Sequence, residues 1–172
     1  LKEYIDVLFD WFKLNSNEFS LHLEAVELAE ASRTILIDWV PILEDRQLDY
    51  HFEIPEGPLP VKLDAEGYAR VLNNLIQNIL THSQADNLGI ALSVQGQRVH
   101  VTVSDDGVGI DKEDLHRIFD RLYKCDKGRS GKGSGLGLSI VRQLVEKMGG
   151  NITADSVVGK GTTFYLSFPL AR

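Results

Sequence analysis

Two asparagines four residues apart stand on one predicted helix and could hold a cation that prefers oxygen ligands. Residues 65–83 place apolar side chains at helical spacing, and Asp64 precedes them as an N-cap residue. At about 100° per residue, Asn74 and Asn78 project along one edge of the apolar stripe, with His82 close to the same edge. An unpaired amide so near a core costs about 1–3 kcal/mol. Nearby backbone could satisfy both amides, or a magnesium ion could, because it takes oxygen ligands and leans on substrate phosphates.

An acidic turn with two glycines follows the predicted strand of residues 99–104. The carboxylate of Asp105 could accept a hydrogen bond from the exocyclic amine of adenine. Gly107 and Gly109 would let the backbone pass close to the ring, and Ile110 would supply an apolar wall. The alternative is an acidic turn that only closes the strand.

A glycine-rich loop opens the predicted helix of residues 138–148. Its sequence is Gly133-Ser134-Gly135-Leu136-Gly137-Leu138. Backbone N–H groups at a helix N-terminus attract anions, so the loop suits phosphates. A dinucleotide fingerprint is excluded because Leu138 stands where its third glycine belongs and no strand directly precedes the loop. A flexible linker is the alternative, although Leu136 and Leu138 would be unusual in one.

The segment before this loop is basic in an otherwise acidic chain. Between residues 121 and 132 there is one acid, and the basic residues are Arg121, Lys124, Lys127, Arg129 and Lys132. Most of them fit a solvated loop. Arg129 is the preferred phosphate ligand, because a guanidinium binds phosphate through two hydrogen bonds.

The elements that must position these residues alternate between helices and strands. The pattern predicts helices at residues 29–45, 65–83, 112–121 and 138–148, after the tail of an amphipathic helix at residues 1–14. It predicts strands at residues 26–28, 48–54, 88–94, 99–104, 152–155 and 163–168, with a turn-rich link at residues 56–60. We therefore expect an α+β fold, a two-layer α/β sandwich with a mostly antiparallel, mixed sheet covered by helices on one face.

Composition narrows the partners and the compartment. The net charge of −7 argues against nucleic acid as a general partner. The lone cysteine, Cys125, permits no internal disulfide and fits a reducing compartment. Asp38 interrupts the longest apolar run, so we expect this fragment to make no membrane contact.

Together, in this order and spacing, the motifs resemble the catalytic domain of sensor histidine kinases, within the ATPase superfamily of gyrase, mismatch-repair and chaperone enzymes. The segments that carry the resemblance are residues 71–83 (N box), 105–110 (first glycine box), 118–130 (phenylalanine box and ATP lid), 133–141 (second glycine box) and 159–164 (last box). The resemblance implies the Bergerat-type ATP-binding fold, with ATP and magnesium as ligands.

The resemblance also implies a role for each matching residue. Asn78 would bind magnesium and Asn74 would lie near the γ-phosphate, which makes these two the catalytic residues. Asp105 would read adenine, Phe119 would anchor the lid, and Tyr123 would pack near the base or ribose. The other residues implied to bind nucleotide are His82, Gly107, Gly109, Ile110, Arg129, Gly133, Ser134, Gly135, Leu136, Gly137, Leu138 and Thr162.

Four positions depart from the family's pattern. Ile79 replaces a usual alanine, and Thr81 replaces a usual lysine that commonly reaches phosphate, so one phosphate contact is in doubt. In the lid, Leu122 replaces a phenylalanine and Lys124 an arginine. These departures imply either a modest affinity for ATP or compensation by Arg129 and Lys132.

Within the resemblance, Asn74 is the residue that distinguishes a kinase from an ATPase. Hydrolysing relatives carry a glutamate there, whereas an amide cannot act as a general base, so a gyrase-like ATPase switch is disfavoured. A pseudokinase that binds partners without nucleotide is disfavoured by the retained Asn78, Asp105 and glycine boxes. None of the chain's histidines (His22, His51, His82, His100, His116) has the context of a phosphoacceptor. We therefore expect transfer of the γ-phosphoryl group to a histidine outside this chain.

The same resemblance predicts organisation and partners. Residues 1–19 would be the end of a dimerisation helix and a linker, and residues 20–172 the ATP-binding catalytic domain. The expected partners are ATP, the histidine-bearing dimerisation domain of the same kinase and, indirectly, a response regulator. The expected location is cytoplasmic, within a membrane-anchored parent sensor.

Overall fold

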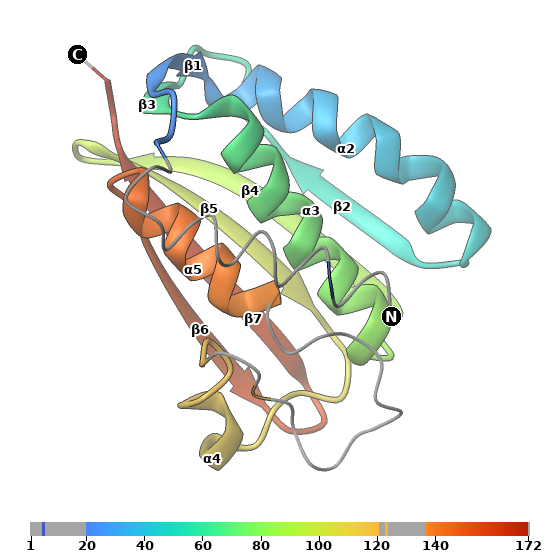
Figure 1. Ribbon diagram of the computed structural model, residues 1–172. Helices are drawn as coiled ribbons and strands as arrows, with labels where there is room; N and C mark the ends of the chain where they lie inside the picture. The colour runs from blue at the N-terminus through green and yellow to red at the C-terminus, as the bar shows by residue number, and fades with distance from the viewer. Residues whose placement is uncertain (1–4, 6–19, 121–122, 124–136, 172) are drawn as a thin grey trace.

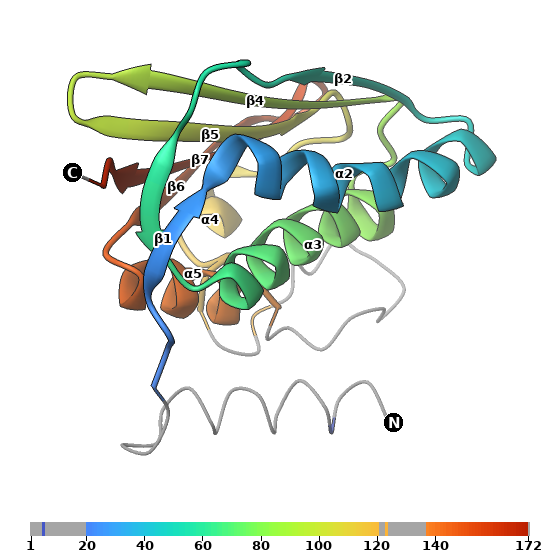
Figure 2. The ribbon, with the colours of Figure 1, turned by 90° about the horizontal axis from the view of Figure 1, so that it is seen from above.

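The chain forms a five-stranded sheet with helices packed on one face (Figure 1). The computed structural model describes residues 5, 20–120, 123 and 137–171. The described elements are β1 (Glu24–Glu27), α2 (Leu28–Asp45), β2 (Asp49–Glu53), β3 (Pro60–Leu63), α3 (Ala65–His82), β4 (Asn87–Gln95), β5 (Arg98–Asp105), α4 (Lys112–Leu115), α5 (Gly137–Lys147), β6 (Asn151–Val157) and β7 (Gly161–Pro169). Figure 2 shows α2, α3 and α5 together on one side of the sheet.

The sheet is mixed and mostly antiparallel, as predicted. Its strand order is β2-β4-β5-β7-β6, in which β2 and β4 run parallel and every other neighbouring pair runs antiparallel. A separate two-stranded sheet joins β1 to β3. The predicted hairpin of β4 and β5 is confirmed, and it turns at Gly96, whose φ of 61° favours glycine. The two-layer prediction is therefore correct.

Two predicted elements differ from the structure. The link of residues 56–60 leads directly into β3, a strand that the sequence pattern did not reveal. This strand buries Val61 and Leu63 and pairs with β1, far away in the chain. The helix predicted at residues 112–121 ends at Leu115. Beyond it, the N–H groups of Arg117 and Asp120 donate to carbonyls only three residues back, which makes a chain of tight turns.

The core lies between the sheet and the helices. The buried side of α3 packs on strands β5 and β7, where Tyr68 meets Phe168 edge to face at 6.2 Å between ring centroids. The Tyr68 hydroxyl has a partner in the buried hydroxyl of Ser32 on α2, at 2.7 Å. This packing holds α3 against the sheet and sets the position of its polar edge. Among the described helices, none has the length and apolar character needed to cross a membrane.

Candidate functional site

The polar edge of α3 carries two amides with free hydrogen-bonding capacity. Asn74 and Asn78 are half-buried, and in the described part of the chain neither side chain has a hydrogen-bond partner. Asn73, on another side of the same helix, differs because its Oδ1 accepts from the indole N–H of Trp39 at 2.8 Å. The alternative in which nearby backbone satisfies both amides is therefore not seen in the described part of the chain. Among these residues, nothing occupies either amide oxygen.

The end of α3 is capped by Ser83. The Ser83 Oγ donates to the carbonyl of Ile79 at 2.7 Å and accepts from the N–H of Ala85 at 3.1 Å. His82, the last residue of the helix, is exposed. Thr81, which stands where the family's lysine would be, accepts a hydrogen bond from the side-chain amide of Gln77 at 3.1 Å.

Asp105 ends β5 on the face that the helices cover. Val99, Val101 and Val103 alternate along β5 and are fully buried, and Asp105 continues their row. Its half-buried carboxylate accepts from the N–H of Gly107 at 2.8 Å. Burial raises the pKa of Asp105, and the N–H donors of Gly107 and Thr162 offset only part of that rise. The Asp105 carboxylate is already partly desolvated, and it can accept a hydrogen bond from a polar group of a ligand.

The glycines of the loop after β5 are required by the protein's own backbone. A Cβ on Gly107 would lie 2.1 Å from the carbonyl oxygen of Ser83, which accepts from the N–H of Val108 at 2.8 Å. Gly109 has a φ of 75°, and a Cβ there would lie 2.3 Å from the carbonyl oxygen of Val157. These contacts give a reason for the glycines that the sequence did not reveal. The contact of both residues with an adenine ring stays a prediction.

Ser156 on β6 joins this loop to the sheet, and the sequence analysis missed it. Its Oγ accepts from the N–H of Ile110 at 2.7 Å, lies 2.8 Å from the hydroxyl of Thr162 and donates to the carbonyl of Gly161 at 2.9 Å. Strand register places Asp105, Thr162 and Ser156 side by side across β5, β7 and β6. A serine in an alternating strand carries no signal of such a role, because only the register of three strands brings these groups together.

Aromatic side chains stand at the next corner. Phe119 is half-buried and meets Phe164 of β7 edge to face at 6.3 Å between centroids. Tyr123 donates its hydroxyl hydrogen to the Asp114 carboxylate, and the guanidinium of Arg117 lies 4.4 Å from its ring centroid. Phe119 is thus held against the core. This position is the one that the predicted role of Phe119 as the anchor of the lid requires.

The structure describes only the second part of the second glycine box, residues 137–141. Gly137 and Leu138 are half-buried in the first turn of α5, beside α3 (Figure 1). The remaining nucleotide-binding candidates lie outside the described residues, as do two of the departures in the lid; they are Arg129, Gly133, Ser134, Gly135, Leu136, Leu122 and Lys124.

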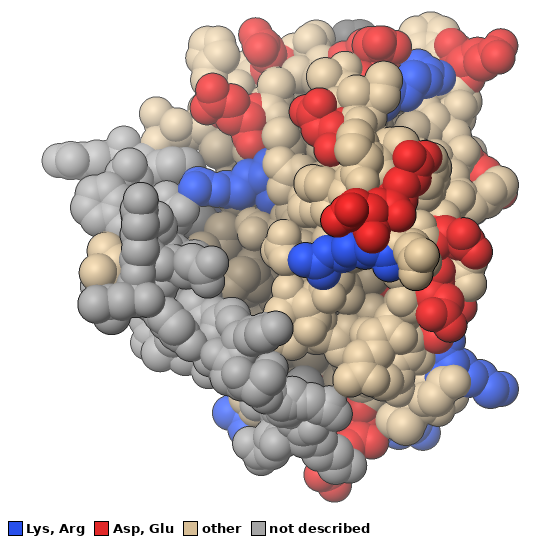
Figure 3. Space-filling model, turned by 90° about the vertical axis from the view of Figure 1, so that its right-hand side faces the viewer, with Lys and Arg blue, Asp and Glu red and all other residues tan. Residues whose placement is uncertain are grey.

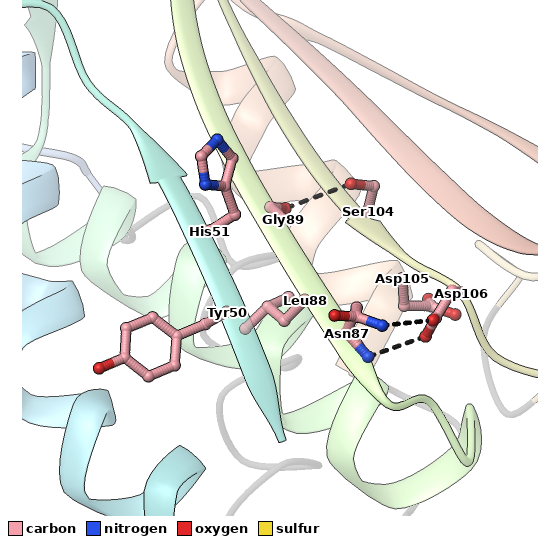
Figure 4. A pocket seen from close by; sticks show the side chains of 8 residues that line it. All are labelled: Tyr50, His51, Asn87, Leu88, Gly89, Ser104, Asp105 and Asp106. Carbon is pink, nitrogen blue, oxygen red and sulfur yellow. Dashed lines mark hydrogen bonds between the residues drawn. The ribbon is translucent and has the colours of Figure 1, made fainter. Parts of the chain in front are cut away.

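A hollow of about 280 Å³ lies at the opposite face of the sheet (Figure 4). Gly89 on β4 has no side chain to fill the space between His51 on β2 and Ser104 on β5, with which it pairs. Asp105 and Asp106 also line this hollow, whereas none of the α3 asparagines does. The hollow therefore adjoins the predicted nucleotide site at Asp105 but does not include the predicted magnesium ligand.

Acidic side chains are spread over much of the face shown in Figure 3, with basic side chains between them. This face therefore has no uniform basic patch for a polyanion among its described residues. A nucleotide bound among the glycine loops would instead depend on local backbone N–H groups.

The described geometry fits known relatives. Residues 63–172 match the family described as histidine kinase-, DNA gyrase B-, and HSP90-like ATPases, which is more than half of the chain. The chain belongs to this ATPase family. Its fold is accordingly the family's ATP-binding fold, the Bergerat fold.

Similar members of this ATPase family are sensor histidine kinases. WalK and YcbM of Bacillus subtilis (strain 168) are each 31% identical over 170 residues. The alignments cover 96% and 97% of this chain but 28% and 55% of those proteins, so the chain spans between about a quarter and a half of their length. The catalytic domain of histidine kinase ThkA, in a nucleotide-free form, is 26% identical, with a TM-score of 0.76 over 88% of this chain and 100% of that one.

Proposed function

We propose that this chain is the ATP-binding catalytic part of a sensor histidine kinase in two-component signalling. It binds Mg-ATP and supplies the γ-phosphoryl group to a histidine on a dimerisation domain outside this chain. One observation carries the proposal. The amides of Asn74 and Asn78, which have no partner among the described residues, and the half-buried carboxylate of Asp105 lie on elements that meet where Ser83 contacts Gly107.

Each group has a chemical task in this proposal. The Asp105 carboxylate accepts a hydrogen bond from the adenine amine, and the row of Thr162 and Ser156 holds Ile110 at the edge of the base. The N-terminus of α5 turns its first N–H groups and the positive end of its helix dipole toward the phosphates. These contacts hold ATP in one orientation, which lowers the entropic barrier to transfer.

The amide oxygen of Asn78 fits magnesium, because magnesium takes oxygen ligands and this oxygen has no partner among the described residues. Bound magnesium would neutralise part of the phosphate charge. Asn74 has no basic group with which to activate water, so hydrolysis is slow. The acceptor is instead a neutral imidazole nitrogen, which is itself a nucleophile.

The proposal includes the wider protein. Residues 1–19 end a dimerisation helix and lead into the catalytic domain, a response regulator receives the phosphoryl group from the phosphorylated histidine, and the domain works in the cytoplasm as part of a membrane-anchored sensor. The sensor histidine kinases among its relatives support this assignment.

Isothermal titration with a non-hydrolysable ATP analogue tests the proposal. Binding should strengthen with magnesium, Asn78→Ala should remove that gain, and Asp105→Asn should abolish binding in both conditions. Asn73→Ala is the matched control, since it removes an amide from another side of the same helix. No binding by the unaltered protein in either condition would overturn the proposal.

Phosphotransfer needs a second assay. The histidine-bearing half of a related kinase, added in trans with labelled ATP, should become phosphorylated with little release of free phosphate. Rapid steady-state phosphate release without label on the histidine would favour an ATPase switch instead.

A further inference from the structure

Asp106, beside the proposed adenine carboxylate, is a hub of hydrogen bonds with no role in the proposed function. Its Oδ1 accepts from the backbone N–H of Asp86 at 2.9 Å and of Asn87 at 2.8 Å. Its Oδ2 accepts from the side-chain amide of Asn87 at 2.7 Å. Figure 4 shows the Asn87 bonds bridging the start of β4 and the end of β5.

These bonds join two loops that meet at the site. One loop, residues 83–87, leaves α3 and enters β4, and the other, residues 105–110, leaves β5. Asp106 makes three bonds from the second loop to the first, and the N–H of Val108 adds a fourth, to the carbonyl of Ser83 at 2.8 Å. The two loops therefore behave as one unit attached to the end of α3.

We propose that Asp106 is a positioning residue that clasps the loop of residues 105–110 to the end of α3, so that Asp105 and Asn78 keep one fixed relative geometry. Its consequence for nucleotide binding rests on the proposed function. The clasp itself is a property of the folded chain without nucleotide.

The charge state of the clasp supports this role. The side-chain and backbone hydrogen bonds from Asn87, together with the N–H of Asp86, lower the pKa of Asp106. Its carboxylate is ionised at neutral pH, and charge-assisted hydrogen bonds are the stronger kind. An exposed aspartate that served only solubility would have no need of three oriented donors.

A reciprocal exchange of side chains provides the sharpest test. In Asp106→Asn the amide oxygen can still accept the two backbone N–H bonds, but the carboxylate charge that strengthens all three bonds is lost, and the Asn87 amide must turn over before its oxygen can accept from the new NH₂ group. Adding Asn87→Asp restores a donor–acceptor pair with the direction reversed. Asn87→Ala is a milder variant that removes only the side-chain bond.

Two measurements read the outcome. Amide hydrogen exchange of the nucleotide-free protein should speed up at Gly107 and Val108 in Asp106→Asn and return toward the parent rate in the double variant. Affinity for the ATP analogue should fall about tenfold in Asp106→Asn and recover in the double variant. Asn87→Ala should lie between the parent and Asp106→Asn.

The results separate this inference from the proposed function. If the parent binds no nucleotide, the proposed function fails while the exchange rates still decide whether the clasp exists. If the parent binds ATP and Asp106→Asn keeps both the affinity and the protection of Gly107 and Val108, the clasp is refuted. Failure of the double variant to recover either property, in a protein whose unfolding remains cooperative, also overturns the proposed geometry.

Discussion

Replacing Gly107 with alanine separates a glycine needed by the fold from one needed only by a ligand. The added Cβ would lie 2.1 Å from the Ser83 carbonyl oxygen, and real Cβ contacts are essentially never under 3.0 Å. The two loops must therefore separate by at least about 0.9 Å if the contact is to be relieved along its own direction. That movement stretches the 2.8 Å hydrogen bond from Val108 to Ser83 well beyond ordinary length.

The cost can be bounded from these contacts. Overpacking strain contributes about 1–3 kcal/mol, and a stretched hydrogen bond that leaves its groups poorly paired contributes about 1–3 kcal/mol. The expected loss is therefore about 2–6 kcal/mol of an unfolding free energy that is typically about 5–15 kcal/mol. With a urea m-value of about 2 kcal/mol/M, the midpoint should fall by about 1–3 M.

The assay is urea unfolding of the nucleotide-free protein, followed by circular dichroism. Gly96→Ala is the matched control, because its φ of 61° is also unfavourable for alanine but no atom lies within 4 Å of the added Cβ. This control should cost only about 1–2 kcal/mol. If Gly107→Ala unfolds at the same urea concentration as the parent and loses only nucleotide affinity, then the glycine serves the ligand alone and the reasoning from the Ser83 contact is wrong.

Three further predictions concern buried or bonded polar groups. Tyr68→Phe leaves the buried Ser32 hydroxyl without its 2.7 Å partner and should lower the free energy of unfolding by about 1–3 kcal/mol. In a double-mutant cycle with Ser32→Ala, the losses of the two single variants should not add, and simple additivity would contradict the bond. Although desolvation opposes it, hydrogen bonds from Leu59 and the first turn of α2 lower the pKa of Glu27. Its stabilising contribution is thus present above its ordinary pKa of 4.5 and lost as the pH falls through the lowered value, and Glu27→Gln should remove that acid-dependent loss in thermal unfolding. Burial raises the pKa of Asp105, so its proton uptake favours the fold as the pH falls through the raised value. The affinity for ATP, measured by calorimetry, should decline over the same pH range. If the affinity stays unchanged down to the pKa of an ordinary aspartate, the adenine contact is refuted.

Local patterns were sufficient to predict the layers and the polar edge of the site. Helical spacing in α3 located its buried side and therefore also located Asn74 and Asn78 beside it. Alternation in β5 located the strand that ends at Asp105. These features depend on residues close together in the chain, so the sequence carries them directly.

The features that sequence reasoning missed all depend on distant contacts. Strand β3 has only four residues, and its partner β1 lies more than thirty residues earlier. Ser156 gains its role from the register of β6 and β7, and Gly107 from a carbonyl oxygen at the end of α3. No local pattern distinguishes such residues from ordinary strand serines or turn glycines.

The proposed site uses polar groups whose burial is unfavourable for the fold. Burial raises the pKa of Asp105, so the fold opposes the charge of this carboxylate. Asn74 and Asn78 are half-buried amides with no described partner. Evolution toward stability alone would replace all three residues, since perturbed and unsatisfied polar groups gather where a ligand completes them. The adenine amine of ATP would donate a hydrogen bond to the Asp105 carboxylate, and the magnesium bound to ATP would be coordinated by the amide oxygen of Asn78. Nucleotide binding should therefore satisfy groups that the folded chain leaves unsatisfied, and it should raise the free energy of unfolding by an amount set by the nucleotide concentration and affinity.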